Sequence, residues 1–440
     1  MKTSSQGPRS ARAISFLDTV TASAIGILLL AFVIPAAQAQ TFTVLHYFTG
    51  GQDGGIPVAG LTMDASGNLY GSTEYGGNPA CFSGGYSGCG TAFKFSPHGS
   101  GWVLTPLFTF AGSTDGAYPL ANLTIASDGS LYGTTSAGGI GHCSAGSNGC
   151  GTAFRLRPAP DRCRSVICEW DETVLYRFTG GNDGGNPQSN LLFDSAGILY
   201  GTTYQGGASA SGVAFELTPS QGGWTESVIH AFAGGTDGAF PWGNLTAESS
   251  GNLDGTTESG GGCGGECGTV FRLTPSGSSW QESILYSFQG QSDGDDPVGG
   301  VTIDAAGNLY GSNNGNDGMV FELAFSHGSW NLMPLYSNLG FGGLPAMTNP
   351  PIVDAAGNLY GTTVFGGGSG CPYGCGEVFK LTPIVGGWTY TVLHDFDYAD
   401  GQAPWGRLVM DSQGNLYGTT VQGGSGNCPE FCGTIWEITP

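Results

Sequence analysis

Residues 304–311 read Asp304-Ala-Ala-Gly-Asn-Leu-Tyr-Gly311, and close copies of this stretch recur along the whole chain. The tripeptide Leu-Tyr-Gly occurs six times, and a seventh copy carries Asp254 in place of the tyrosine. The copies follow one another at about 58 residues, a period typical of repeat architectures. The six tyrosines are Tyr70, Tyr132, Tyr200, Tyr310, Tyr360 and Tyr417. The chain therefore consists of seven similar units.

Each unit contains four short segments with the pattern of β-strands. In the fourth unit they are residues 244–247, 253–257, 268–273 and 280–288. The first two are joined by a tight turn of the Asp-Ala-Ala-Gly-Asn type, in which a glycine such as Gly307 supplies the positive φ of a bulged hairpin. No segment shows a sustained helical period with caps. We therefore expect an all-β, seven-bladed β-propeller of four-stranded antiparallel blades.

The two ends of the repeat region are offset against the repeat. Residues 42–48 match the fourth strand of a unit, whereas residues 433–440 match the third. The N-terminal strand can therefore complete the last blade in a 3+1 arrangement, which leaves no open sheet between the first and last blades. An open solenoid would have no use for this offset. We expect a closed ring.

Units such as Asp304-Ala-Ala-Gly-Asn-Leu-Tyr-Gly311 and Cys267-Gly-Thr-Val-Phe-Arg-Leu-Thr-Pro275 also resemble the GloVer tandem repeat. The resemblance covers residues 41–440. It implies an exported, propeller-like bacterial protein that is secreted or located at the cell surface. The family offers no established activity that could be transferred to this chain.

The first 39 residues have the composition of a signal peptide. Three cations, Lys2, Arg9 and Arg12, precede an apolar run over residues 24–34, and Ala37-Gln-Ala39 fits a cleavage site. The apolar run is shorter than the roughly 20 residues of a membrane-spanning helix, although a retained anchor is the alternative interpretation. We expect a signal peptide at 1–39, a single propeller domain at 40–440, no permanent membrane insertion, and a secreted, periplasmic or cell-surface location.

The composition excludes several classes of protein. The 34 Asp and Glu residues outnumber the 12 Lys and Arg residues, for a net charge of −22. Such a chain repels the phosphates of nucleic acid, so we expect no nucleic-acid partner. The 81 glycines follow no third-position period, which excludes collagen. Aromatic residues make up 11% of the chain, enough to build a core and to argue against disorder.

The 12 cysteines form six close pairs. Five pairs fall in loops between second and third strands, and the pair Cys163/Cys168 falls in an insertion. An even count and strict local pairing in an exported chain predict disulfides. Zinc binding is the alternative, but it needs further ligands, and only His142 lies within such a loop. The other five pairs are Cys81/Cys89, Cys143/Cys150, Cys263/Cys267, Cys371/Cys375 and Cys428/Cys432.

Six of the seven connections between units carry the motif Asp-Gly-x-x-Pro. Two interpretations are open: a ring of carboxylates at the channel mouth that binds a cation or cationic ligand, or a set of turns capped by aspartate and fixed by proline. Repetition in nearly every unit favours the structural role. The six aspartates are Asp53, Asp115, Asp183, Asp237, Asp293 and Asp400.

The residue after the proline of this motif breaks the repeat. It is Trp242 in one unit and Trp405 in another three blades away, so the two rings are expected to face each other across the mouth. Exposed, they could stack on sugars; buried, they would only fill the channel. Together with Asp237 and Asp400 they are our candidate ligand-binding residues. Asp254, Asp295, Asp296 and the charged insertion 161–172 are further departures from the repeat, without an interpretation.

Catalytic signatures are sparse. The chain contains neither a G-x-S-x-G nor an H-E-x-x-H motif. His46, His230 and His394 occupy a fourth-strand position that is tyrosine elsewhere, which predicts packing roles. We therefore expect a monomeric, exported, non-enzymatic propeller that binds a glycan or protein through its loop face, with no cofactor and no metal. The alternatives are an extracellular polysaccharide lyase or hydrolase and a structural envelope protein.

Overall fold

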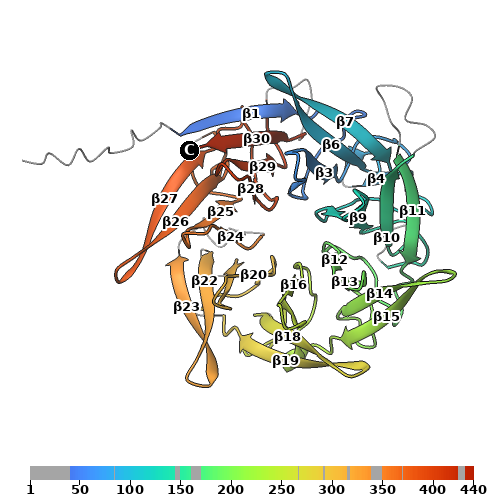
Figure 1. Cartoon of the computed structure of the whole chain (residues 1–440), viewed down its shortest axis with the longest axis vertical. Coiled ribbons are helices and arrows are strands. Elements are labelled where there is room, and N and C mark those ends of the chain that lie inside the picture. The colour runs from blue at the N-terminus through green and yellow to red at the C-terminus, as the bar shows by residue number, and fades with distance from the viewer. Residues whose placement is uncertain are drawn as a thin grey trace, which may run out of the picture. The chain divides into compact units, whose positions relative to one another are not determined.

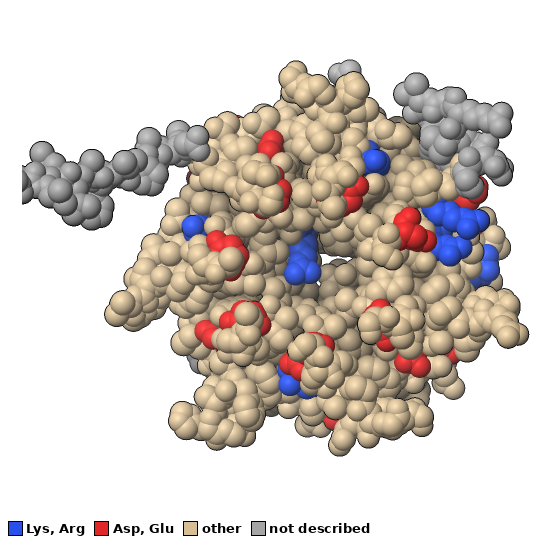
Figure 2. Space-filling model, viewed as in Figure 1, with Lys and Arg blue, Asp and Glu red and all other residues tan. Residues whose placement is uncertain are grey.

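Seven four-stranded antiparallel sheets are arranged in a closed ring (Figure 1), and the space-filling view has an opening at its centre (Figure 2). The computed structural model describes residues 40–83, 85–143, 149–159, 170–265, 267–290, 293–314, 318–337, 349–368, 370–424 and 432–440. The predicted fold class is confirmed, including the number of blades and strands.

In six blades the strands run in chain order from the channel outward, and in the seventh the N-terminal strand is outermost. The first four blades consist of β2 (Thr62–Met63), β3 (Leu69–Thr73), β6 (Thr91–His98) and β7 (Gly101–Thr109); β8 (Thr124–Ile125), β9 (Leu131–Thr135), β10 (Thr152–Pro158) and β11 (Trp170–Arg177); β12 (Leu192–Phe193), β13 (Leu199–Thr203), β14 (Val213–Ser220) and β15 (Gly223–Ala231); and β16 (Thr246–Ala247), β17 (Leu253–Thr257), β18 (Thr269–Ser276) and β19 (Ser279–Ser287).

The remaining three blades complete the ring. They consist of β20 (Val301–Ile303), β21 (Leu309–Asn313), β22 (Met319–Ser326) and β23 (Ser329–Ser337); β24 (Ile352–Val353), β25 (Leu359–Thr363), β26 (Glu377–Ile384) and β27 (Gly387–Asp395); and β28 (Val409–Met410), β29 (Leu416–Thr420) and β30 (Thr434–Thr439) with β1 (Thr41–Tyr47). Outside the blades lie a hairpin of β4 (Phe82–Ser83) and β5 (Tyr86–Ser87) and one 3₁₀ turn, η1 (Gly235–Asp237).

The recurring turn is organised by its aspartate. The carboxylate of Asp304 accepts hydrogen bonds from the backbone N–H of Ala306 at 2.8 Å and of Asn308 at 2.9 Å, and from the hydroxyl of Tyr310 at 3.2 Å. Gly307 supplies the left-handed φ of 87° that closes the turn. The motif therefore ties its own tyrosine to its own turn.

The core lies between neighbouring blades. One cluster joins Leu107 of the first blade to Leu131 and Phe154 of the second. The glycine of Leu-Tyr-Gly makes this packing possible, because a Cβ at Gly133 would lie 2.7 Å from the ring of Phe154. The glycine of the motif therefore leaves space for one buried aromatic ring of the adjacent third strand.

The N-terminal strand closes the ring as predicted. β1 pairs with β30 from Thr41 opposite Thr439 to Tyr47 opposite Thr434, with a bulge between Val44 and His46. In the first blade the pairing of the third and fourth strands shifts in the same way between Ala92 and Phe93. The equivalent shift recurs in other blades. β1 therefore takes the place of a fourth strand in every geometric respect. The predicted signal peptide at 1–39 lies outside the described residues. In the part of the chain that is described, no helix is long and apolar enough to cross a membrane.

Candidate functional site at the channel mouth

The connections between blades hold one residue in an unusual backbone conformation. The residue before the proline adopts a left-handed φ between 49° and 58°, although it is never glycine. Such backbone is costly for a residue with a side chain, and it persists only where the surrounding structure enforces it. The six residues are Ile56, Tyr118, Asn186, Phe240, Asp296 and Ala403.

Hydrogen bonds to both adjacent blades enforce this conformation. The N–H of Tyr118 donates to the carbonyl of Cys89 at 2.9 Å, and its own carbonyl accepts from the N–H of Ser136 at 3.1 Å. At the ring closure Ile56 likewise donates to Cys432. The connection is therefore a rigid bridge whose backbone repeats, while its side chains vary in chemistry.

These connections meet at a cavity of ≈ 200 Å³ in the mouth of the channel. Trp242 of the fourth blade and Trp405 of the seventh both line it and are both half-buried. Both tryptophans therefore line one cavity, and a placement face to face across the mouth remains a prediction. The corresponding residues of four other blades also line the cavity, namely Val58, Leu120, Gln188 and Val298.

The wall around Trp242 is aromatic. Tyr204 packs edge-on to Trp242 with ring centroids 5.8 Å apart, and it stacks on Phe240 at 5.1 Å. The phenol of Tyr204 is hydrogen-bonded to the carboxyl of Glu258, which lines the cavity beside Asp296. This half of the mouth combines flat rings with two carboxyl groups.

The wall around Trp405 is mostly apolar. Ile56, Ala403 and Val421 form a buried cluster against which Trp405 packs. The backbone carbonyl of Trp405 accepts a hydrogen bond from the side chain of Asn349 at 2.6 Å, which ties the seventh blade to the sixth. The two tryptophans therefore sit in different surroundings, and a ligand between them would meet an apolar wall and a polar one.

Burial changes the ionisation of the mouth residues. It raises the pKa of Glu258, and burial together with the charge of Glu258 raises the pKa of Tyr204 to about 12. Beside the mouth, burial raises the pKa of Glu74 to about 7. Carboxyl groups in this environment carry a proton more readily than carboxyl groups in water.

Asp237 and Asp400 are placed away from the cavity. The carboxylate of Asp237 accepts from the N–H of Ala233 at 2.6 Å and contacts His230 at 3.3 Å on the outer strand β15. Asp400 accepts from the N–H of Asp397 at 2.8 Å and contacts His394 at 2.9 Å. Both hold their turns, and neither lines the cavity. Their role as ligands for a bound molecule remains a prediction, and the histidines have the packing positions expected for them.

A second set of carboxyl groups was not foreseen from the sequence. Glu282 of β19 lies beside Asp237 of the preceding connection, and burial together with the charge of Asp237 raises its pKa to about 7. Potential ligand atoms of His230, Asp237 and Glu282 lie within 4.8 Å of one another. In the sequence, only three units carry a glutamate two residues after the tryptophan of the fourth strand. These glutamates are Glu172, Glu226 and Glu282.

The same pairing recurs at two neighbouring blade interfaces. Burial raises the pKa of Glu226 beside Asp183 to about 7, and it does the same for Glu172 beside Asp115. The hydroxyl of Tyr176 takes the position of the histidine in the former. The arrangement therefore forms with either an imidazole or a phenol beside the aspartate.

Four of the predicted disulfides are present among the described residues. They are Cys81–Cys89, Cys143–Cys150, Cys263–Cys267 and Cys371–Cys375. Zinc binding by these eight cysteines is therefore wrong. Cys163, Cys168 and Cys428 lie outside the described residues. Disulfides of this kind belong to an oxidising, extracytoplasmic environment.

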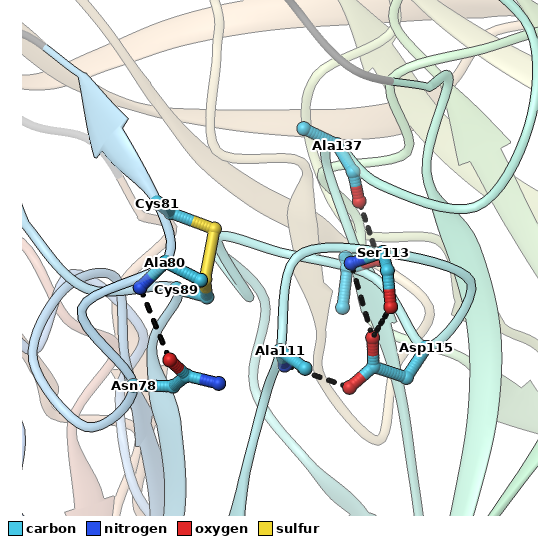
Figure 3. The surroundings of a disulfide bond; sticks show 9 residues. Asn78, Ala80, Cys81, Cys89, Ala111, Ser113, Asp115 and Ala137 are labelled. Atoms are coloured by element: carbon cyan, nitrogen blue, oxygen red, sulfur yellow. Dashed lines mark hydrogen bonds between the residues drawn. A yellow bond between two sulfur atoms is a disulfide. The ribbon is translucent and has the colours of Figure 1, made fainter.

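The disulfides support the mouth connections. Figure 3 shows the Cys81–Cys89 bond beside the turn of Asp115, whose carboxylate accepts from the N–H of Ala111 at 2.7 Å. A Cβ on Gly112 of this turn would lie 2.1 Å from the sulfur of Cys81. The sulfurs therefore fill the space under the turn that leads to Tyr118.

Solved structures with a similar fold share little sequence with the chain. The periplasmic gluconolactonase of Pseudomonas aeruginosa is 14% identical over 78% of this chain and 92% of its own, with a TM-score of 0.44. The NanB sialidase of Streptococcus pneumoniae is 11% identical over 90% and 70%, with a TM-score of 0.41. A protein of unknown function from Dyadobacter fermentans is 10% identical over 91% and 99%, with a TM-score of 0.45. Likeness at this level concerns the fold alone.

No curated protein matches the chain. A family model does. The Gloeobacter/Verrucomicrobia repeat matches residues 32–159, 141–347 and 316–440, which together take in both ends of the ring. The resemblance noted from the repeated units is thereby confirmed, and the chain belongs to the Gloeobacter/Verrucomicrobia repeat family.

Proposed function

We propose that this protein is an exported, non-enzymatic propeller that binds a glycan or a protein side chain at the mouth of its channel. The observation that carries the proposal is that Trp242 of the fourth blade and Trp405 of the seventh are half-buried and line one cavity. Flat rings held by a proline-fixed backbone lose little entropy when a ligand binds.

The chemistry of the walls narrows the class of ligand. The cavity of ≈ 200 Å³ is smaller than the roughly 300–1,000 Å³ of typical small-molecule sites. It therefore suits one ring-sized group, such as a terminal sugar or one exposed side chain of a partner protein. Glu258 and Asp296 in the wall favour neutral or cationic groups and disfavour polyanions.

A glycan array screened with the mature protein tests the proposal. The ligand found there should quench tryptophan fluorescence in the native protein and bind at least tenfold more weakly to Trp242→Ala and Trp405→Ala. Trp102→Phe is the matched control, because Trp102 stacks on Phe95 at 5.0 Å outside the cavity. Equal affinity in all four proteins would contradict the proposal.

The pair Glu258 and Tyr204 supports an extracellular polysaccharide lyase or hydrolase as the second candidate. A carboxyl group of raised pKa joined to a phenol beside Asp296 has the parts of an acid–base couple. Glu258→Gln separates the two functions. It would abolish turnover of a polysaccharide by an enzyme, whereas a binding protein would show no turnover in either the native or the variant form.

Location, oligomeric state and partners complete the proposal. The protein acts outside the cytoplasm as a monomer, without a cofactor and without nucleic acid, after removal of residues 1–39. N-terminal sequencing of the exported protein, together with its mass in solution, tests these statements.

A further inference from the structure

A second cavity of ≈ 380 Å³ lies in the channel below the mouth. Asn122 and Asn244 line both cavities, so the mouth leads into it. The residues around it come from the first strands of the blades and from the positions just before them. Figure 2 shows Lys and Arg atoms beside the central opening, on a molecule whose net charge is −22.

One position before each first strand forms a ring around this cavity. Six of its seven members are uncharged, and the seventh is Arg407. Arg407 belongs to the last blade, while Asn122, Asn190 and Asn244 come from the second, third and fourth. The members in chain order are Gly60, Asn122, Asn190, Asn244, Gly300, Pro350 and Arg407. The positive charge of Arg407 is therefore specific to the last blade and is not required by the repeat.

The side chain of Arg407 extends from the seventh blade to the fifth. Its terminal nitrogen donates to the hydroxyl of Thr302 on β20 of the fifth blade, at 3.2 Å. The side chain of Arg407 is half-buried, and burial lowers the pKa of its guanidinium with no carboxylate acting against it. In the described part of the chain no ion pair forms at Arg407. A cation in such a place is unstable unless an anion compensates it.

The asparagines supply further donors to the same cavity. The Oδ1 of Asn244 accepts from the backbone N–H of Asn190 at 2.8 Å, which leaves the NH₂ group of Asn244 available. Asn122 and Asn190 also line this cavity, and their side-chain amides carry NH₂ donors as well. The carboxyl groups of Glu258 and Asp296 belong to the upper cavity and do not line the lower one.

We propose that the channel binds one small carboxylate anion between Arg407 and the asparagine side chains. A guanidinium presents two parallel N–H donors that match the two oxygens of a carboxylate, and amide NH₂ groups can complete the shell. The negative exterior admits a single monoanion more readily than a polyanion. This site lies below Trp242 and Trp405 and does not depend on what binds there.

Acetate, chloride and inorganic phosphate at equal ionic strength test the site. The melting temperature of the mature protein should rise by several degrees in acetate relative to chloride, and calorimetry should give one site per chain. Arg407→Met should melt higher than the native protein in chloride, because it removes an uncompensated cation. It should also show no response to acetate.

Two further variants keep the test decisive. Asn190→Leu retains the cation and should weaken acetate binding several-fold, even if Arg407→Met fails to fold. Trp242→Ala should bind acetate as the native protein does, so failure of the mouth site and failure of this site are distinguishable. An equal response to acetate and chloride, an acetate response that survives in Arg407→Met, or a response to phosphate alone would each overturn the proposal.

Discussion

The carboxylate of Asp254 accepts two hydrogen bonds from the guanidinium of Arg272, at 2.7 Å from Nε and at 3.0 Å from the terminal nitrogen. Asp254 is fully buried and stands where the other six units have tyrosine. In two of those units a lysine lies over that tyrosine ring, Lys94 over Tyr70 and Lys380 over Tyr360. The fourth blade has therefore replaced a cation–ring contact by an ion pair.

The first prediction concerns this pair. Arg272→Met should lower the free energy of unfolding by about 3–5 kcal/mol, because it leaves a buried carboxylate without its partner. Asp254→Tyr combined with Glu248→Asp restores the residues of the neighbouring units and should stay close to the native stability. Chemical denaturation of both variants measures the difference. Equal losses in the two would show that the pair has no special role.

The second prediction concerns closure of the ring. Removal of residues 41–48 leaves β30 with an unpaired edge and removes Phe48, which is 1% exposed. We expect a large fall in melting temperature and aggregation through the free edge. The control is a chain that begins at Gln40. Monomeric elution with an unchanged melting temperature would contradict the assignment of β1 to the last blade.

The third prediction concerns Glu172, Glu226 and Glu282, whose pKa values are raised to about 7. The folded protein binds these protons more tightly than the unfolded chain does, so their contribution to stability is complete below about pH 4.5. It is lost as the pH rises toward 7. Glutamine mimics the protonated form. Glu282→Gln should therefore raise the melting temperature at pH 8 and change it little at pH 5.

Glu216→Gln on β14 is the control for this pH series, since Glu216 belongs to none of the three carboxyl pairs. A shift of equal size at pH 5 and pH 8 in Glu282→Gln would contradict the raised pKa. Loss of stability at pH 8, reversed by addition of a divalent cation to the native protein alone, would instead reveal a metal site at His230, Asp237 and Glu282.

The fourth prediction concerns the disulfides. Their loops are short, with sequence separations of 4 to 8 residues, so each stabilises the protein by roughly 2–3 kcal/mol in the loop-entropy model. Reduction should lower the melting temperature and weaken binding at the mouth, while the circular-dichroism signal of the sheets persists. In the third blade Ser211 accepts the N–H of Phe240 without any disulfide, so the ring itself should survive. Complete unfolding on reduction would contradict this view.

The fold could be predicted because short sequence motifs specify its turns, its packing and its closure. The tyrosine of the motif donates a hydrogen bond to the aspartate of its own turn, and the glycine leaves room for a phenylalanine ring. The offset of the two ends specifies the closure. Trp242 and Trp405 were found for the same reason, since they break a strict repeat. Glu258, Tyr204 and Arg407 were missed because each sits at a position that varies between units, so that no strict repeat is broken there. Only the three-dimensional ring shows that those positions surround one channel.

The pairing of β1 with β30 also determines the order in which the blades can form. Thr41 is among the first residues of the ring to be synthesised, and its partner Thr439 is nearly the last. Six blades are contiguous in the chain and can form as they emerge, whereas the seventh waits until β30 has been synthesised. During that interval the nascent protein is an open arc with an unsatisfied strand at its leading end. Its most vulnerable moment therefore comes just before completion, and a ribosome that stops short of the final strand releases a chain that cannot close.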